Sequence, residues 1–153
     1  MKALVQRVSQ ASVSIQGQVV AEIGQGLVVL LGVGRGDIEE DARYLAEKIA
    51  NLRIFSDEAD KFNLSALDVK GEALVISQFT LYAGTRKGRR PSFTDAAPPQ
   101  DAEPMVGKFV QFLHDAGLKA DTGRFQQHMH VEIHNDGPVT IFIDSAERLS
   151  PRK

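Results

Sequence analysis

The 153-residue sequence has no cysteine, no long hydrophobic segment and very little net charge. Without cysteine, the chain can form no disulfide bond and no thiolate metal site, and it has no thiol nucleophile. Its longest apolar run, from Gly26 to Val33, is far shorter than the roughly 20 residues of a membrane-spanning helix. The N-terminus, Met1 to Arg7, becomes polar too early for a secretory signal. We therefore expect a cytoplasmic protein that does not contact a membrane.

The net charge is −2, so the chain as a whole does not attract nucleic acid. One segment departs from this balance, because four of the five residues from 86 to 90 are basic: Arg86, Lys87, Arg89 and Arg90. Such a run is either a solvated loop or a local contact for nucleic-acid phosphates.

The chain length fits one domain that covers residues 1–153. Alternating apolar and polar residues predict strands over residues 2–9, 11–15 and 19–23. Residues 27–31 are apolar on both faces, which is typical of a central strand that is covered on both sides. Another apolar run predicts a strand over residues 73–81.

Two segments carry apolar residues at helical spacing. One is predicted to begin at an N-cap on Asp37 and to end near Asn51, and the other to cover residues 102–116 with Gly117 as its stop. Residues 52–55 indicate a short strand, and residues 56–69 a polar connection. Residues 128–134 and 139–144 are predicted to pair as an antiparallel hairpin around the turn Asn135-Asp136-Gly137-Pro138. The fold class is therefore α/β, with mixed sheets and two main helices.

Polar side chains follow the apolar run in the segment Ser77-Gln78-Phe79-Thr80. The Thr80 hydroxyl is a nucleophile, a hydrogen-bond donor to a reacting ester, or simply a strand hydroxyl bonded to the backbone. No histidine or carboxylate lies nearby in the sequence to act as its general base. Backbone N–H groups near Ser77 and Gln78 are candidates for an oxyanion hole. Phe79 is either a core residue or a stacking surface.

The second notable segment, residues 135–140, combines turn-forming residues with an X-Pro bond that can be cis. Because glycine is unusually free in φ, Gly137 can present its carbonyl at an angle that other residues cannot reach. Carbonyls at such a turn can accept hydrogen bonds from an α-ammonium group. On the pattern alone, an ordinary tight turn is the simpler interpretation.

Together the two segments resemble the signature pair of the D-aminoacyl-tRNA deacylases, which remove D-amino acids mischarged onto tRNA. The resemblance extends over nearly the whole chain, through Arg7-Val8, Ala11-Ser12-Val13, Gly24-Gln25-Gly26-Leu27, Lys87-Gly88-Arg89-Arg90-Pro91-Ser92-Phe93 and Thr122-Gly123-Arg124-Phe125. It implies a single-domain layered β/β/α fold that assembles as a homodimer. It also implies aminoacyl-tRNA as the partner, hydrolysis of its ester bond, and no metal or other cofactor.

The resemblance also implies roles for particular residues. In this family a cis glycine–proline dipeptide enters the active site of the other subunit and excludes L-residues through main-chain atoms. Gly137 and Pro138 would form this cross-subunit selector. The resemblance further implies a catalytic segment (Ser77, Gln78, Phe79 and Thr80), an adenosine pocket (Phe125 and Met129), supporting residues (Arg7, Asn135 and Thr140) and contacts to acceptor-stem phosphates (Arg86, Lys87, Arg89 and Arg90).

One segment departs from the family pattern. The family usually reads Phe-Gly-Ala-Asp-Met or close to it, whereas this chain has two glutamines and a histidine between Phe125 and Met129. The glutamines add bulk beside the expected adenosine pocket, at positions 126 and 127.

A competing hypothesis comes from His128, His130, Glu132 and His134, which share one face of a predicted strand. A histidine pair with a nearby carboxylate can bind zinc and activate water. A polar outer face is the favoured interpretation, because no fourth ligand is evident.

Three functional hypotheses therefore follow. The first is a metal-free hydrolase of D-aminoacyl-tRNA, and of glycyl-tRNA as in the family. The second is a related deacylase for an L-aminoacyl-tRNA, which a trans bond at Pro138 would indicate. The third is a module that binds the tRNA end without turnover.

Overall fold

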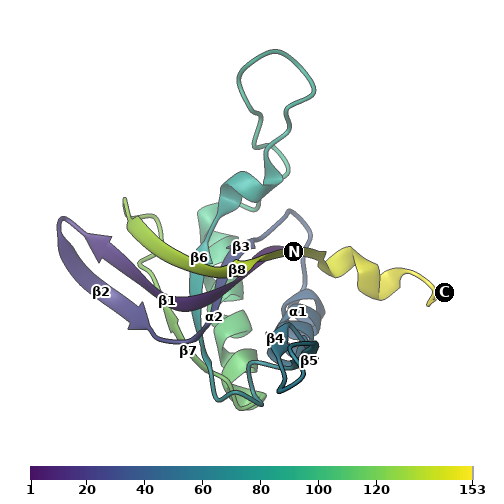
Figure 1. Ribbon diagram of the computed structural model, residues 1–153. Coiled ribbons are helices and arrows are strands. Elements are labelled where there is room, and N and C mark those ends of the chain that lie inside the picture. Colours follow the sequence, from purple (N-terminus) through teal and green to yellow (C-terminus); the bar gives the residue numbers. More distant parts are fainter. Residues whose placement is uncertain (153) are drawn as a thin grey trace.

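The computed structural model describes residues 1–152 (Figure 1). These residues form eight strands and two α-helices, with two short 3-10 helices. In chain order they are β1 Lys2–Ile15, β2 Gln18–Ile23, β3 Gly26–Gly32, α1 Glu39–Asn51, β4 Phe55–Ser56, β5 Phe62–Leu64, β6 Glu72–Ser77, η1 Phe79–Tyr82, α2 Pro99–Asp115, β7 Lys119–Thr122, β8 His130–Asp144 and η2 Ser145–Leu149. The α/β class with a mixed sheet and two helices is confirmed.

The long strand β1 organises the main sheet. Ala3 pairs with Leu31 of β3 and with Ile143 of β8, so β3 and β8 lie on opposite sides of β1. The second half of β1 pairs with β2 instead of β3. Beyond β3 the sheet continues with β6 and β7, and these three strands are parallel. Their carboxyl ends therefore meet at the same edge, which is where parallel sheets commonly bind ligands.

Both faces of the central strands are covered, as the apolar run over residues 27–31 predicts. On one face, alternate residues of β1, β3 and β6 pack against α1 and α2, and Phe109 of α2 is fully buried there. On the other face, the second half of β1, β2 and the start of β8 pack over Val28, Leu74 and Ile76. In Figure 1 this ribbon extends to the left, away from the helices. The result is the expected β/β/α layering.

A glycine sets the spacing between β3 and β6. A Cβ atom on Gly26 would lie 1.8 Å from the backbone oxygen of Glu72. Only a residue without a side chain lets the two strands approach at this point. The position of β6, which ends at Ser77, depends on this contact.

The predicted N-cap of the first helix is wrong. Ile38 occupies the N-cap position, and its N–H group donates to Asp41 Oδ2 at 2.9 Å. Asp37 instead accepts a hydrogen bond from the N–H group of Gly34 at 2.6 Å. Its carboxylate also lies 2.9 Å from the α-ammonium of Met1. Asp37 therefore fastens the β3–α1 loop to the start of β1.

Asp41 joins α1 to the end of the chain. Its Oδ1 accepts hydrogen bonds from Ser145 Oγ at 2.9 Å and from Arg148 Nε at 3.1 Å. Burial opposes ionisation of this carboxyl, but the hydrogen bonds from Ile38, Arg148 and Ser145 outweigh it and hold the pKa of Asp41 below its ordinary value. The folded state therefore favours the ionised carboxylate.

Several predicted boundaries change. The strand over residues 73–81 ends at Ser77, and the following residues form η1. The second helix begins at Pro99, three residues earlier than expected, because proline is well tolerated at the first helical position. The connection over residues 56–69 contains β5, which pairs with β4 in a small hairpin. Strand β7 was not predicted.

The hairpin predicted near the C-terminus is also wrong. Residues 130–144 form the single strand β8, which pairs with β1 on both sides of the glycine–proline dipeptide. Gln6 pairs with Thr140 and Val8 pairs with Asn135. Residues 136–139 of β8 thus oppose Arg7 alone, and the segment forms a bulge rather than a turn.

Candidate active site

The main cavity lies at the carboxyl ends of β3 and β6. Its volume is about 730 Å³, within the range of small-molecule sites. Strand β6 contributes Ser77 and the following Gln78 and Phe79, and the other wall comes from the segment after β3, residues 96–99 and residues 125–129. The structure therefore brings Ser77, Gln78 and Phe79 together with the expected adenosine pocket, whereas Thr80 follows them without lining the cavity.

The signature residues adopt a tight local arrangement after β6. The N–H group of Gln78 donates to Leu31 O at 2.8 Å, which continues the pairing with β3 by one residue. The Gln78 side-chain amide then donates to Thr80 Oγ1. Thr80 is exposed, and within residues 1–152 no histidine or carboxylate hydrogen-bonds to its hydroxyl. The Thr80 proton is thus free to be donated, but no general base is positioned to remove it.

Phe79 is not a core residue. Its side chain is 55% exposed and meets Phe93 edge to face, with ring centroids 4.9 Å apart. Phe93 lies after the loop that carries the basic residues and also lines the main cavity. Phe93 was not predicted as a site residue, although it ends the segment Lys87-Gly88-Arg89-Arg90-Pro91-Ser92-Phe93 that contributes to the family resemblance.

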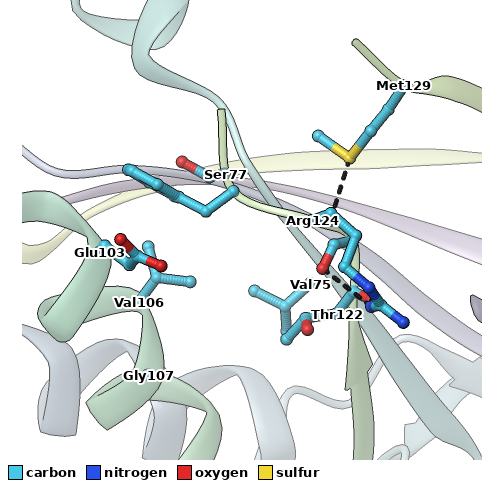
Figure 2. Close-up of a pocket in the computed structure, with 10 residues that line it drawn as sticks. Val75, Ser77, Glu103, Val106, Gly107, Thr122, Arg124 and Met129 are labelled. Carbon is cyan, nitrogen blue, oxygen red and sulfur yellow. Dashed lines mark hydrogen bonds between the residues drawn. The ribbon is translucent and has the colours of Figure 1, made fainter. Parts of the chain in front are cut away.

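Phe125 and Met129 separate the main cavity from a smaller one. The smaller cavity has a volume of about 300 Å³ and also lies against Ser77, Thr122 and Glu103 (Figure 2). Met129 Sδ accepts a hydrogen bond from the N–H group of Arg124 at 3.4 Å. A Cβ atom on Gly123 would lie 2.5 Å from the same sulfur, so glycine is needed for Met129 to occupy this place.

The segment that departs from the family pattern forms the rim of the main cavity. Gln126 has φ 62°, a left-handed conformation that glycine adopts more easily. The turn is closed by a hydrogen bond from Gln127 N–H to Arg124 O at 3.2 Å. Gln126, Gln127 and His128 all line the cavity, so the extra bulk lies directly at the site.

The Gly137–Pro138 bond is cis, as the resemblance implies, and not the trans bond that would indicate the second hypothesis. Gly137 has φ 143°, and a Cβ atom on it would lie 2.8 Å from Val139 Cγ2 and 3.2 Å from Arg7 Nη2. Glycine is therefore required at this position both by conformation and by packing.

Arg7 holds the bulge from the neighbouring strand. Its Nε donates to Asp136 O at 2.8 Å, and its Nη1 donates to Ile54 O at 2.8 Å. The guanidinium also lies over the ring of Phe62, 5.4 Å from its centroid. The side chain is only 12% exposed. Arg7 thus connects the bulge to the β4–β5 hairpin.

Asn135 closes the bulge from inside. Its Oδ1 accepts a hydrogen bond from Val139 N–H at 2.8 Å, and its Nδ2 donates to Thr140 Oγ1 at 3.1 Å. Gln6 Nε2 also donates to Thr140 Oγ1, at 3.3 Å. These contacts place Asn135 and Thr140 as braces of residues 136–139.

Within one chain, the glycine–proline bulge lies far from the main cavity. Ser77 is level with Leu31, Ala3 and Ile143 across the sheet, and Pro138 precedes Ile143 by five residues. With about 3.3 Å per residue and about 4.8 Å between strands, the two sites are roughly 20 Å apart. The structure does not bring the two signature segments together in one subunit.

The basic residues lie on a projecting loop between η1 and α2, seen at the top of Figure 1. The loop is closed at its base by hydrogen bonds between Gly84 and Ser92, at 2.6 and 2.8 Å. All of its basic residues are exposed: Arg86, Lys87, Arg89 and Arg90.

The histidine face is a solvent-exposed edge. His130, Glu132 and His134 are exposed, whereas Met129, Val131 and Ile133 pack against the second core. Among residues 1–152, no three such side chains converge in a geometry that could hold a metal ion. In the same residues no helix is long and apolar enough to cross a membrane.

Comparison with known proteins defines the class. The sequence profile of the family described as D-Tyr-tRNA(Tyr) deacylase matches residues 4–144. A D-aminoacyl-tRNA deacylase of Roseiflexus sp. (strain RS-1) is 61% identical over 99% of this chain and 98% of its own length. One from Dehalococcoides mccartyi (strain BAV1) is 60% identical over 99% of both chains.

Two solved structures share the fold. One, named as a c-Myc DNA Unwinding Element Binding Protein, superposes with a TM-score of 0.89 at 40% identity and covers 99% of this chain and 100% of its own. The other, described as a probable eukaryotic D-amino acid tRNA deacylase, gives 0.80 at 16% identity over 94% and 98% of the two chains. At that identity the second match supports the fold alone.

The fold and the site thus define a hydrolase with a cavity at the carboxyl edge of a mixed sheet. More particularly, the chain belongs to the D-Tyr-tRNA(Tyr) deacylase family.

Proposed function

We propose that this protein hydrolyses the ester bond of D-aminoacyl-tRNA in the cytoplasm, releasing the D-amino acid and the tRNA. The observation that carries the proposal is the placement of Ser77, Gln78 and Phe79 on the main cavity of a chain that is 61% identical to a D-aminoacyl-tRNA deacylase. The cavity volume of about 730 Å³ suits an aminoacyl group esterified to one nucleoside.

In this proposal Thr80 is a hydrogen-bond donor rather than a nucleophile. Its oxygen already accepts a hydrogen bond from the Gln78 amide, and no base is positioned to take its proton. A donor at this place stabilises the developing oxyanion of the ester, together with backbone N–H groups of the η1 turn. Water is then the attacking group, and the tRNA ribose is the leaving group.

The terminal adenosine is proposed to bind between the two cavities. Phe125 and Met129 line both of them, and the smaller cavity of about 300 Å³ has room for a base. The ribose would then lie beside Ser77, with the ester facing the η1 turn. Gln126 and Gln127 border the main cavity and would contact the substrate from its rim.

Chiral selection is proposed to come from the Gly137–Pro138 bulge of a second subunit. The roughly 20 Å between bulge and cavity in one chain supports a contribution from another copy. Main-chain atoms at the α-carbon reject the substituent that an L-residue carries there, whatever its side chain. Glycine has no such substituent, so we propose that glycyl-tRNA is also hydrolysed.

An apolar row beside the second core, on a part of the sheet face that β2 and the start of β8 leave uncovered, supports a homodimer. Leu4 of β1 pairs with Leu30 of β3 on one side and with Phe142 of β8 on the other, and Phe142 is 53% exposed. This row lies between the bulge and the carboxyl ends of β3 and β6. We propose that two copies stack on this row about a two-fold axis, with each bulge at the partner's cavity.

Hydrolysis of matched D-tyrosyl- and L-tyrosyl-tRNA by the purified protein tests the activity. We expect rapid loss of the D-ester, loss of glycyl-tRNA and a stable L-ester. Equal rates for the two enantiomers would contradict the proposal. Thr80→Val is expected to slow the reaction without abolishing it, whereas complete loss would indicate a nucleophile.

Subunit complementation tests the composite site. Phe79→Ala and Gly137→Val each damage one half of it, and a mixed sample contains heterodimers with one intact site. We expect the mixture to recover D-selective hydrolysis, which neither variant has alone. Phe142→Asp is expected to yield an inactive monomer in sedimentation experiments, while Val19→Asp, which also alters an exposed apolar side chain, stays dimeric and active. An active Phe142→Asp monomer would refute the cross-subunit mechanism.

A second candidate function is nucleic-acid binding without turnover. It is favoured by the name of the 40% identical structure, which refers to a DNA unwinding element, and by the exposed basic loop. Under this alternative, the protein binds tRNA or DNA in a salt-dependent way, and the ester half-life of D-aminoacyl-tRNA is unchanged. Multiple turnovers per protein molecule would exclude it.

A further inference from the structure

Arg35 occupies a fixed position beside the proposed site. It follows β3, and its N–H group donates to Asp95 O at 2.9 Å. Its Nε donates to Thr94 O at 2.7 Å. In the described residues 1–152, the two terminal nitrogens of Arg35 have no hydrogen-bond or ion-pair partner. The guanidinium is thus fixed through its Nε by Thr94 O, and its two terminal N–H₂ groups are free to bind an anion.

This arginine stands between two cavities. It lines the main cavity of about 730 Å³, together with Phe79 and Phe93. It also lines a third cavity of about 470 Å³, on the other side of residues 97 and 98. The two cavities share Val33, Arg35, Ala97 and Pro98, so they adjoin each other at Arg35.

Apart from Arg35 at its rim, the charged side chains of the third cavity are acidic. Asp37 and Asp101 line it, with Gln100, Pro104 and Met105. The carboxylate of Asp37 is already engaged by Gly34 and by the α-ammonium of Met1. Two carboxylates disfavour a phosphate inside the cavity, but not an uncharged ribose or base. The anion is therefore expected at Arg35, and the uncharged part of the ligand beyond it.

We propose that Arg35 binds the phosphodiester that joins the last two nucleotides of the tRNA, and that the third cavity receives the ribose and base of the penultimate nucleotide. This proposal rests on the proposed function, because it takes the ester and the ribose of the terminal nucleoside to lie in the main cavity beside Ser77. The 5′ phosphate of that nucleoside must leave across the rim, and Arg35 offers a planar pair of donors for it.

The test uses three D-tyrosyl esters of increasing length: adenosine, adenosine 5′-phosphate and the dinucleotide CpA. For the wild-type enzyme we expect kcat/KM to rise at least about 10-fold when the phosphate is added, as for a charged hydrogen-bonded pair. A further rise of at least about fivefold is expected when the cytidine is added. An enzyme that hydrolyses all three esters equally well has the proposed function but refutes the role of Arg35.

Variants then assign the effect to Arg35. Arg35→Met is expected to remove the gain from the phosphate, so that the variant hydrolyses the adenosine 5′-phosphate ester no faster than the adenosine ester. Arg35→Lys keeps the charge and should recover part of the gain. Arg152→Met is the matched control, because Arg152 is exposed and lines none of the three cavities.

Equal losses of activity in Arg35→Met on all three esters would show that Arg35 only supports residues 94–97. No gain from cytidine would refute the use of the third cavity, and inactivity of the wild type on every ester would refute the function itself.

Discussion

Arg7 connects the glycine–proline bulge to the rest of the protein, so its replacement tests how the bulge is held. Arg7→Met keeps the apolar stem but removes both hydrogen bonds of 2.8 Å, to Asp136 O and to Ile54 O. A hydrogen bond from a charged group contributes about 1.5–3 kcal/mol. Water can reach Asp136 O in the variant, whereas Ile54 O is partly buried and loses its partner. We therefore expect a loss of about 3 kcal/mol in the free energy of unfolding.

Thermal unfolding and substrate selectivity measure the two consequences. For a chain of this length, about 3 kcal/mol lowers Tm by roughly 6–12 °C. The ratio of D-tyrosyl-tRNA to L-tyrosyl-tRNA hydrolysis is expected to fall at least about 10-fold. A change of about 1.4 kcal/mol in the difference between the two activation free energies is sufficient for this. Arg7→Lys keeps the charge but cannot bridge both carbonyls, so it should show the same loss of selectivity with a smaller loss of stability.

Two outcomes would contradict this reasoning. If Arg7→Met lowers Tm but leaves the D-to-L ratio intact, Arg7 stabilises the fold without positioning the selector. If neither quantity changes, the two carbonyl contacts are not important in solution. Asp68→Asn is a suitable comparison for stability, because its carboxylate accepts a backbone hydrogen bond from Ser65 at 2.8 Å in a turn remote from the bulge.

Three further predictions concern packing, pH and salt. Gly26→Ala should lower the free energy of unfolding in urea by at least about 3 kcal/mol or prevent folding, because its Cβ would meet Glu72 O at 1.8 Å. The control Gly24→Ala places its Cβ within 4 Å of nothing, so its free energy of unfolding should stay within about 0.5 kcal/mol of the wild type. The pKa of Asp41 is lower in the folded state, so its stabilising effect is present above the unfolded pKa of about 3.9 and is lost as pH falls through the folded value. Asp41→Asn should therefore be less stable at pH 7 and should lose less stability on acidification to pH ~2; an unchanged acid-unfolding curve would contradict this. Replacing the cations of residues 86–90 by glutamine should make tRNA binding less dependent on salt. The slope of log K against log salt concentration should fall in magnitude by about 0.7–0.9 for each phosphate that is no longer neutralised. An unchanged slope would show that the loop does not contact tRNA phosphates.

The parts of the fold that the sequence predicted are those in which local pattern and tertiary contact agree. The strand over residues 27–31 has apolar residues on both faces, and it lies between the helices and the second core. Both helices follow from apolar spacing, which tolerates errors of a few residues at their ends. The N-cap failed because Asp37 binds the N–H group of Gly34 and the start of β1 instead of the helix. That competition involves residues distant in sequence.

Part of the lining of the main cavity was expected from the sequence, but its arrangement was not. Ser77, Gln78, Phe79, Phe125 and Met129 meet at one cavity, although they come from two separate parts of the chain. Arg35 and Phe93 were missed, because a single arginine after a strand and a single phenylalanine after a basic loop have no distinctive pattern. They belong to the site only because residues 94–97 return to β3 through backbone hydrogen bonds.

The bulge in β8 shows why turn-forming residues did not make a turn. A hairpin would have required residues 130–134 to pair with residues 139–144, but β1 is long enough to pair with both halves of β8 at once. Each half therefore gains a full antiparallel partner, and only residues 136–139 are left unpaired opposite Arg7. Their exposed main chain is fixed by Arg7 from the adjacent strand and by Asn135 from within. A turn at the tip of a hairpin would lack the first of these contacts and would move with its loop. A bulge in a paired strand has the rigidity that the proposed selection through main-chain atoms requires.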